Sequence, residues 1–227
     1  MEERTRIKLC GLMSEEDVRK AVSLQPDYIG FILSPAFRRF ADPALVKAWR
    51  SRCLDRLRDL DGPGLPADRM DGTESDVRRI PQAVGVFVDE DPTYVIRQLR
   101  EGVIDIAQLH GQEDNSYIRQ IKEMTDKTVI KAFTIRSEAD VTVALQSAAD
   151  QILLDAGTGE GRSFNWKLAA GISRDFFLAG GLTPENVAEA ITQVHPYAVD
   201  VSSGIETNGK KDPERMEIFV KTVRDTQ

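Results

Sequence analysis

The sequence predicts a single parallel (β/α)₈ barrel, the TIM barrel, and two observations lead to this prediction. Eight short apolar runs follow one another along the 227 residues, and a helix-like segment comes after each run. The runs begin at intervals of about 21 to 25 residues, apart from one gap of about 55 residues whose excess, once removed, restores the rhythm. A doubly wound open sheet is the structural alternative, but eight regular units favour closure.

The predicted strands are short apolar runs, as expected of parallel strands that are buried on both faces. The first strand ends on Cys10 and is cut by Gly11, and the seventh and eighth strands are also followed by glycine-containing breaks. The strands are predicted at residues 6–10, 28–33, 83–88, 104–109, 128–133, 151–155, 176–179 and 197–201.

The predicted helices begin at residues that commonly cap helices. Ser14 with Asp17 three residues later is typical of a capping box, and Asp-Pro pairs open helices at Asp42, Asp91 and Asp212. The helices are predicted at residues 14–24, 43–54, 92–100, 115–124, 137–147, 164–171, 184–193 and from 213 nearly to the C-terminus.

Residues 55–80 interrupt this pattern. The stretch is crowded with Asp, Arg, Gly and Pro, contains no aromatic residue and shows no sustained apolar period. We therefore predict a flexible insertion within a single domain that spans residues 1–227, although the beginning of the stretch is helix-like and could extend the preceding helix. Because the insertion joins a helix to the next strand, it is expected at the barrel end opposite the chemistry.

Composition argues against several classes of function. A net charge of −7 disfavours a nucleic acid or a membrane surface as the main partner, and no apolar run approaches the roughly 18 residues of a membrane helix. Two cysteines are too few for a disulfide scaffold, and the first residues lack signal-peptide character, so a cytoplasmic location is expected. The two histidines stand in no metal-binding motif, and no metal site is predicted.

Active sites of such barrels are built where the strands end and the following loops begin. This rule selects Cys10, Arg38 or Arg39, His110, Asp155, Gly180, Gly181 and residues 200–204, which include Asp200, Ser203 and Gly204. Each residue type also has an ordinary explanation. A free cysteine is usually a small buried hydrophobe, a glycine pair is often a tight turn, an arginine pair is often solvated, and His110 fits a hydrogen-bonded structural role equally well.

Position in the barrel gives these residues a chemical interpretation. Cys10 and Asp155 are expected to face each other across the barrel mouth, as a base and an acid acting on one substrate. A thiol ordinarily ionises near pH 8.5 and an aspartic acid near pH 3.9, so these roles cost about 2 and about 4 kcal/mol at neutral pH unless the surroundings shift the pKa values. Lys8 shares the strand face of Cys10 and is expected to lower the pKa of the thiol.

Three further features indicate substrate contacts or buried partners. Glycines after the seventh and eighth strands would expose backbone N–H groups beside a helix start, an arrangement that binds phosphate. Asp200 lies inside an apolar strand, where a carboxylate needs a partner. An arginine after the second strand could bind a substrate carboxylate.

Taken together, the motifs resemble the phosphoribosylanthranilate isomerase family of tryptophan biosynthesis. The resemblance runs in order through all eight strands. It is carried by KLCGL at 8–12, GF at 30–31, RF at 39–40, VGVFV at 84–88, QLHG at 108–111, LD at 154–155, FNW at 164–166, LAGGLTPENV at 178–187 and VDVSSGIE at 199–206.

The resemblance implies an Amadori rearrangement of N-(5-phospho-β-D-ribosyl)anthranilate, a phosphorylated small molecule, to 1-(2-carboxyphenylamino)-1-deoxy-D-ribulose 5-phosphate without a cofactor. In this family's pattern Asp155 would be the general acid, Cys10 the general base and Arg39 the ligand of the substrate carboxylate. The same resemblance implies that Asp200 and His110 orient the substrate and that backbone amides around Gly180, Gly181, Ser203 and Gly204 bind the phosphate. The protein is expected to be a monomer or a homodimer.

Two departures from the family pattern and two alternatives complete the picture. The loop at 156–163 is slightly shorter than expected, and the insertion at 55–80 is unusual. A histidine-pathway sugar isomerase is similar, but that family has aspartate where Cys10 stands and a second phosphate cradle on the opposite half of the barrel. A sensor of phosphorylated sugars is the alternative outside the enzymes, and the presence of both Cys10 and Asp155 disfavours it.

Overall fold

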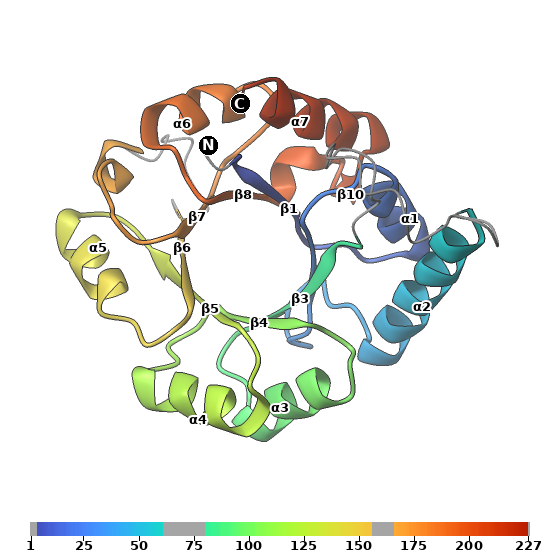
Figure 1. The fold of residues 1–227 in the computed structure, drawn as a ribbon, viewed down its shortest axis with the longest axis horizontal. Coiled ribbons are helices and arrows are strands. Elements are labelled where there is room, and N and C mark those ends of the chain that lie inside the picture. The colour runs from blue at the N-terminus through green and yellow to red at the C-terminus, as the bar shows by residue number, and fades with distance from the viewer. Residues whose placement is uncertain (1–3, 61–79, 156–165, 227) are drawn as a thin grey trace, which may run out of the picture.

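Eight parallel strands close into a barrel in sequence order, from β1 next to β2 around to β8 next to β1 (Figure 1). The computed structural model describes residues 4–60, 80–155 and 166–226. The strands are β1 (Arg6–Leu9), β2 (Tyr28–Ile32), β3 (Gln82–Phe87), β4 (Ile106–Leu109), β5 (Val129–Thr134), β6 (Gln151–Asp155), β7 (Phe176–Ala179) and β8 (Ala198–Val201). The predicted (β/α)₈ barrel is confirmed.

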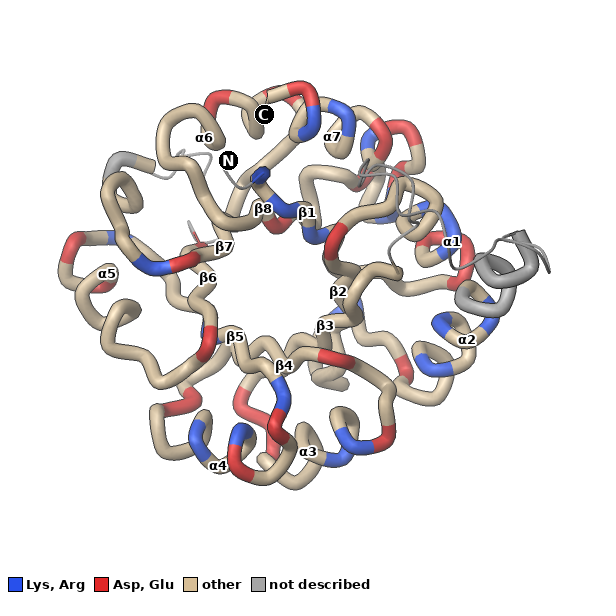
Figure 2. The backbone as a smooth tube through the Cα atoms, in the orientation of Figure 1, with Lys and Arg blue, Asp and Glu red and all other residues tan. Residues whose placement is uncertain are grey.

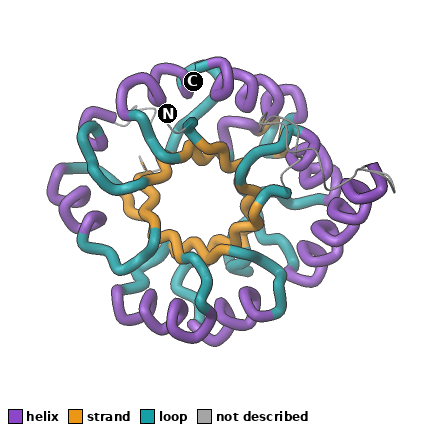
Figure 3. The backbone as a smooth tube through the Cα atoms, in the orientation of Figure 1, coloured by secondary structure: helices purple, strands orange, loops and turns teal. Residues whose placement is uncertain are grey.

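Helices form a layer outside the ring of strands, as the purple coils around the orange ring of Figure 3 show. They are α1 (Glu15–Ser23), α2 (Pro43–Leu60), α3 (Pro92–Arg100), α4 (Asn115–Thr125), α5 (Glu138–Leu145), the 3₁₀ helix η1 (Trp166–Ala169), α6 (Val187–Val194) and α7 (Pro213–Asp225). A second 3₁₀ turn, η2 (Ser203–Ile205), and a hairpin of β9 (Glu206–Thr207) and β10 (Lys210–Lys211) lie between β8 and α7.

The predicted caps set the helix starts. Ser14 accepts a hydrogen bond from the Asp17 amide in a reciprocal capping box. The side chains of Asp42, Asp91 and Asp212 each accept a hydrogen bond from a backbone amide in the first turn of the helix that follows. These local hydrogen bonds satisfy amides that have no partner within the helix.

One predicted helix start is wrong by three residues. The sequence predicts a helix from residue 184, whereas α6 begins at Val187. The Asn186 side chain accepts a hydrogen bond from the Thr183 amide and donates one to the Gly181 carbonyl. The Val187 amide donates a hydrogen bond to the Thr183 carbonyl, so residues 183–186 form a capping turn that leads directly into α6.

Two apolar layers hold the barrel together. The larger core lies between the strands and the helices and includes Leu9, Phe31 and Phe219. The smaller core fills the barrel interior with residues from alternate positions, among them Tyr28, Val84, Ile106, Ile130, Leu153, Phe177 and Ala198. Because side chains alternate along a strand, the residues two positions after these inner residues also face the barrel axis.

Lys8 and Asp200 form an ion pair on the inner face of the barrel, above this apolar layer. They are directly paired in the register of β1 and β8, and Lys8 Nζ lies 2.9 Å from Asp200 Oδ2. The Lys8 side chain is fully buried and that of Asp200 is 9% exposed. Figure 2 shows that most other charged residues lie on the outer helices and loops. Lys8 is thus the partner that the sequence requires for Asp200.

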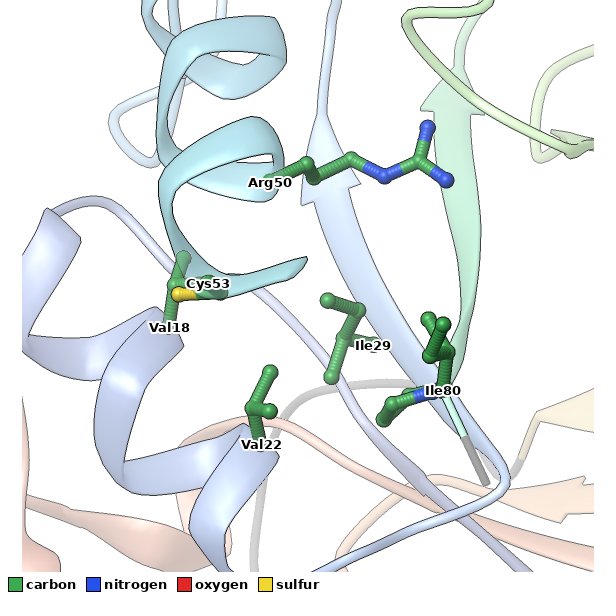
Figure 4. Close-up of a pocket in the computed structure, with 7 residues that line it drawn as sticks. Val18, Val22, Ile29, Arg50, Cys53 and Ile80 are labelled. Carbon is green, nitrogen blue, oxygen red and sulfur yellow. The ribbon is translucent and has the colours of Figure 1, made fainter. Parts of the chain in front are cut away.

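The predicted insertion lies mostly outside the described residues. Residues 55–60 continue α2, and the description resumes at Ile80, before β3. Near this point Val18, Val22, Ile29 and Cys53 line a small apolar gap between α1, α2 and β2 (Figure 4). Cys53 is 6% exposed and packs in the layer between strands and helices, so it has the ordinary role of a buried small hydrophobe. No described helix combines the length and the apolar character needed to cross a membrane.

We expect that Lys8→Met lowers the free energy of unfolding by about 3–5 kcal/mol, because it leaves the Asp200 carboxylate buried without a counter-charge. The measurement is urea unfolding at pH 7. Lys20→Met is the matched control, since Lys20 pairs with Glu217 at the surface with 26% and 64% of their side chains exposed. That change is expected to cost less than about 1 kcal/mol. Equal costs for the two variants would contradict a stabilising role of the buried pair.

Candidate active site

The predicted catalytic residues lie on the inner face at the carboxyl end of the barrel. Cys10 is two residues after Lys8, His110 follows Gln108 by two, and Asp155 follows the interior residue Leu153 by two. The alternation of side chains therefore brings all three to the barrel mouth. Two strands, β7 and β8, separate β6 from β1 in the ring, which places Asp155 and Cys10 on different sides of the mouth.

Cys10 is tightly enclosed. Its exposed fraction is 5%, and its amide donates a hydrogen bond of 2.9 Å to the Val201 carbonyl of β8. A Cβ atom on Gly30 would lie only 2.6 Å from Cys10 Sγ. Glycine at position 30 is thus required for the thiol to occupy its place at the end of β1.

Burial and charge act on the Cys10 thiol in opposite directions. Burial raises the pKa of Cys10, and Asp200 raises it further, whereas Lys8 and Lys211 lower it. The net pKa lies above the ordinary value. Lys8 therefore acts on Cys10 as the sequence predicts, but its effect is smaller than the effect of burial. For Lys8 itself, burial alone would lower the pKa, and the charges of Asp200 and Cys10 raise it above the ordinary value, so the lysine remains a cation.

His110 lies beside the predicted acid. His110 Nε2 is 3.3 Å from Asp155 Oδ2, and their side chains are 31% and 15% exposed. The imidazole Nδ1 is 3.5 Å from Gln108 Nε2. The structure thus brings two sequence-selected residues together, and the pair can exchange or share a proton.

A buried ion pair holds the loop that carries His110. Lys131 Nζ lies 3.0 Å from Glu113 Oε2 and donates a hydrogen bond of 2.7 Å to the Gly111 carbonyl. The same Glu113 oxygen accepts a hydrogen bond from the Gly111 amide. The sequence analysis missed this network. In the sequence, Lys131 is a single charged residue within an apolar strand, and no motif connects it to Glu113.

Arg39 extends from the loop after β2 to a partner that the sequence analysis did not select. Its Nε and Nη2 donate hydrogen bonds of 2.7 and 2.9 Å to the two carboxylate oxygens of Glu206. Lys211 Nζ lies 3.0 Å from the same carboxylate. The side chain of Arg38 is 64% exposed and reaches Glu206 only at 3.6 Å. Of the two arginines, Arg39 is therefore the one held at the mouth.

The β9–β10 hairpin that carries Glu206 and Lys211 was also missed. The signal was present, because Asn208-Gly209 is a typical two-residue hairpin turn. Both residues have positive φ, 53° and 75°, as such a turn requires. Glu206 lies on one strand and Lys211 directly opposite on the other.

The predicted phosphate-binding residues come from two loops that touch. Gly180 and Gly181 follow β7 with φ of 85° and 67°, and Ser203 and Gly204 follow β8. A Cβ atom on Gly204 would lie 1.8 Å from the Leu182 carbonyl oxygen. The absence of a side chain at Gly204 therefore allows the two loops to pack backbone against backbone.

The part of the chain that the structure describes contains no group of three His, Cys, Asp or Glu side chains placed to hold a metal ion. The loop at 156–163 lies outside the described residues.

Comparison with known proteins gives consistent matches over this architecture. A family model described as N-(5′phosphoribosyl)anthranilate (PRA) isomerase matches residues 70–222. The N-(5′-phosphoribosyl)anthranilate isomerase of Endomicrobium trichonymphae is 36% identical over 96% of this chain and 98% of its own length. The protein of the same name from Rhodospirillum rubrum is 40% identical over 97% and 98%.

Solved structures give the same result. Phosphoribosyl anthranilate isomerase from Thermotoga maritima is 32% identical, with a TM-score of 0.79 over 97% of this chain and 99% of that one. A phosphoribosyl anthranilate isomerase in complex with reduced 1-(o-carboxyphenylamino)-1-deoxyribulose 5-phosphate matches with a TM-score of 0.75, 32% identity and the same coverage. A structure of monomers of the dimeric Thermotoga maritima enzyme matches with a TM-score of 0.77, at the same identity and coverage.

We expect the rate of alkylation of Cys10 by iodoacetamide to rise with pH through a midpoint above that of an exposed thiol, because burial raises the pKa of Cys10 above its ordinary value. The rate is measured by mass spectrometry in a Cys53→Ser background, with N-acetylcysteine as the reference thiol. Restricted access of the reagent slows the reaction by the same factor at every pH, so the midpoint reports the ionisation of the thiol. A midpoint below that of the reference thiol would contradict the expectation.

Proposed function

The chain belongs to the N-(5′-phosphoribosyl)anthranilate isomerase family, and from this premise we propose that Cys10 and Asp155 carry out the family's reaction as general base and general acid. The reaction is the isomerisation of N-(5-phospho-β-D-ribosyl)anthranilate to 1-(2-carboxyphenylamino)-1-deoxy-D-ribulose 5-phosphate in tryptophan biosynthesis. One observation supports the assignment of roles most strongly. The buried Cys10 thiol and the Asp155 carboxyl group lie on different sides of one barrel mouth. Arg39, which is fixed by hydrogen bonds to Glu206, lies at the same mouth.

In the first step Asp155 gives a proton to the ribose ring oxygen. The bond from C1′ to that oxygen breaks, and the nitrogen lone pair forms the C=N bond of a Schiff base. His110, at 3.3 Å, is placed to orient the Asp155 carboxyl group and to exchange its proton. We propose that His110 contributes to substrate orientation through this contact.

In the second step the Cys10 thiolate takes the C2′ proton. The electron pair of the C–H bond forms the C1′=C2′ double bond, and the C=N electrons return to nitrogen, which gives an enolamine. Loss of the enol proton and protonation at C1′ complete the ketose. Deprotonating Cys10 at neutral pH costs free energy because its pKa is raised, and Lys8 and Lys211 reduce that cost. Asp200 is proposed to hold Lys8 in place and to orient the sugar.

The charged ends of the substrate have separate proposed sites. Arg39 would bind the anthranilate carboxylate through the N–H groups that Glu206 does not use. Backbone amides around Gly180, Gly181, Ser203 and Gly204 would bind the phosphate, supported by the close packing of the two loops at Gly204. This division matches a substrate with one carboxylate and one phosphate.

We also propose the organisation of the molecule around the site. Residues 1–227 would form a single barrel domain in which the insertion enters between α2 and β3, at the end opposite the site. We propose a cytoplasmic enzyme, a monomer or a homodimer, that works on a small phosphorylated substrate and has no nucleic-acid partner. Cys10, at a position where a histidine-pathway isomerase has aspartate, disfavours that alternative.

We expect Cys10→Ser and Asp155→Asn each to lower kcat by at least about 10²-fold, because each removes a proton-transfer group. The assay follows the loss of substrate fluorescence, and circular dichroism checks the fold. Cys53→Ser is the matched control and is expected to stay within about threefold of the wild type, since Cys53 lies in the layer between strands and helices. Near-normal turnover in either active-site variant would defeat the assignment.

Deletion of residues 60–76 is expected to leave kcat within a few-fold of the full-length value, because this stretch joins a helix to the next strand, away from the carboxyl ends of the strands. The same fluorescence assay measures the rate, and thermal unfolding shows whether the shortened protein is folded. A large loss of kcat in folded protein would show that the insertion serves the site.

A further inference from the structure

We propose that Glu206 and Lys211 are positioning residues that fix the Arg39 guanidinium beside Cys10 and make the site selective for a substrate carboxylate. This proposal rests on the proposed function, because it assumes that Arg39 binds the carboxylate. It adds that the β9–β10 hairpin determines where Arg39 stands and which of its N–H groups face the substrate.

The hairpin places two opposite charges in a buried position. Glu206 and Lys211 are directly opposite each other across β9 and β10, and their side chains are 6% and 1% exposed. Lys211 Nζ also donates a hydrogen bond of 2.9 Å to the carbonyl of Ser202, the residue after β8. Lys211 therefore connects the hairpin to the end of a barrel strand, and Glu206 takes its position from that connection.

Glu206 determines which edge of Arg39 stays available. A guanidinium has five N–H groups in one plane. Glu206 accepts from Nε and from Nη2 along one edge, and no other hydrogen bond of Arg39 occurs among the described residues. The edge formed by Nη1 and Nη2 is thus presented as a second fork, and this geometry suits one further carboxylate.

Charge balance permits a second carboxylate at this place. Arg38, Arg39 and Lys211 all lie within 4.0 Å of the Glu206 carboxylate, so three cations face one anion. Burial alone would raise the pKa of Glu206, but hydrogen bonds from Arg39 and Lys211 hold the pKa at about 2. Glu206 is therefore ionised at every pH at which the enzyme could work, and the cluster keeps a positive excess.

The cluster lies directly beside the base. A Cβ atom placed on Gly11, the residue after Cys10, would lie 3.1 Å from Arg39 Cδ and 3.4 Å from Lys211 Nζ. Gly11 has φ of 74°. A carboxylate bound by Arg39 would thus lie close to the thiol. The substrate requires this, because its carboxyphenyl group is attached through nitrogen to C1′, and Cys10 acts on the neighbouring atom C2′.

The test compares two probes by isothermal titration calorimetry. One is reduced 1-(o-carboxyphenylamino)-1-deoxyribulose 5-phosphate, and the other is its phenylamino counterpart without the carboxylate. Glu206→Gln is expected to weaken binding of the first probe by at least about tenfold and of the second by less than about threefold, because only the first needs Arg39 in place. Arg39→Met is expected to show the same selective loss, and adding Glu206→Gln to it is expected to cost less than about twofold more.

Controls separate the outcomes. Glu217→Gln removes a surface ion pair between Glu217 on α7 and Lys20 on α1, and it is expected to leave both affinities unchanged. If Glu206→Gln does not fold, Lys211→Gln replaces it in the test. This variant keeps Glu206 but removes the cation that positions it, and it is expected to weaken binding of the carboxylate-containing probe alone. Equal losses on both probes, no loss, or full additivity with Arg39→Met would overturn the proposal. Failure of the wild-type protein to bind the first probe and to turn over phosphoribosylanthranilate would instead overturn the proposed function.

Discussion

The ion pair between Lys8 and Asp200 is the interaction on which the active site depends. Closure of the barrel puts β1 beside β8, and the register places these two residues opposite each other on the inner face. A lysine and a carboxylate are costly in an apolar interior unless they are paired. The pair therefore favours the one register that satisfies both charges. The same register brings Cys10 to the Val201 carbonyl and sets the height of the thiol in the mouth.

Enclosure of Cys10 makes the thiol harder to ionise and makes the thiolate, once formed, interact more strongly with nearby cations. A thiol surrounded by the Gly30 backbone, Lys8 and the end of β8 loses hydration, and its pKa rises. The same enclosure strengthens the attraction of the thiolate to Lys8 and Lys211, because charges interact more strongly where water is excluded. The thiol is thus mostly protonated at rest but gives a strong base once ionised. Such a base suits removal of a proton from carbon.

How far the sequence could predict this molecule depends on the range of each interaction. Strands and caps follow from neighbours within a few residues, as at Ser14 and Asp17. The strand ends selected His110 and Asp155, and the structure brings their side chains to within 3.3 Å of each other. The contact between Arg39 and Glu206 joins residues 167 positions apart, and no local pattern reveals it. The predicted helix start at residue 184 precedes the observed start of α6 at Val187, because Thr183 and Asn186 close residues 183–186 into a capping turn before the helix.

The distribution of charge explains how an acidic protein can hold an anionic substrate. The net charge of −7 belongs to the whole chain, and most charged residues lie on the outer helices and loops (Figure 2). Where β1, β8 and the hairpin meet, the ion pairs among the described residues join Lys8, Lys211, Arg38 and Arg39 to Asp200 and Glu206. Local excess positive charge acts over a few ångströms, whereas the outer charges are screened beyond about 8 Å at physiological salt. The two carboxylates do not remove the local positive excess, because four cations surround two anions at this place.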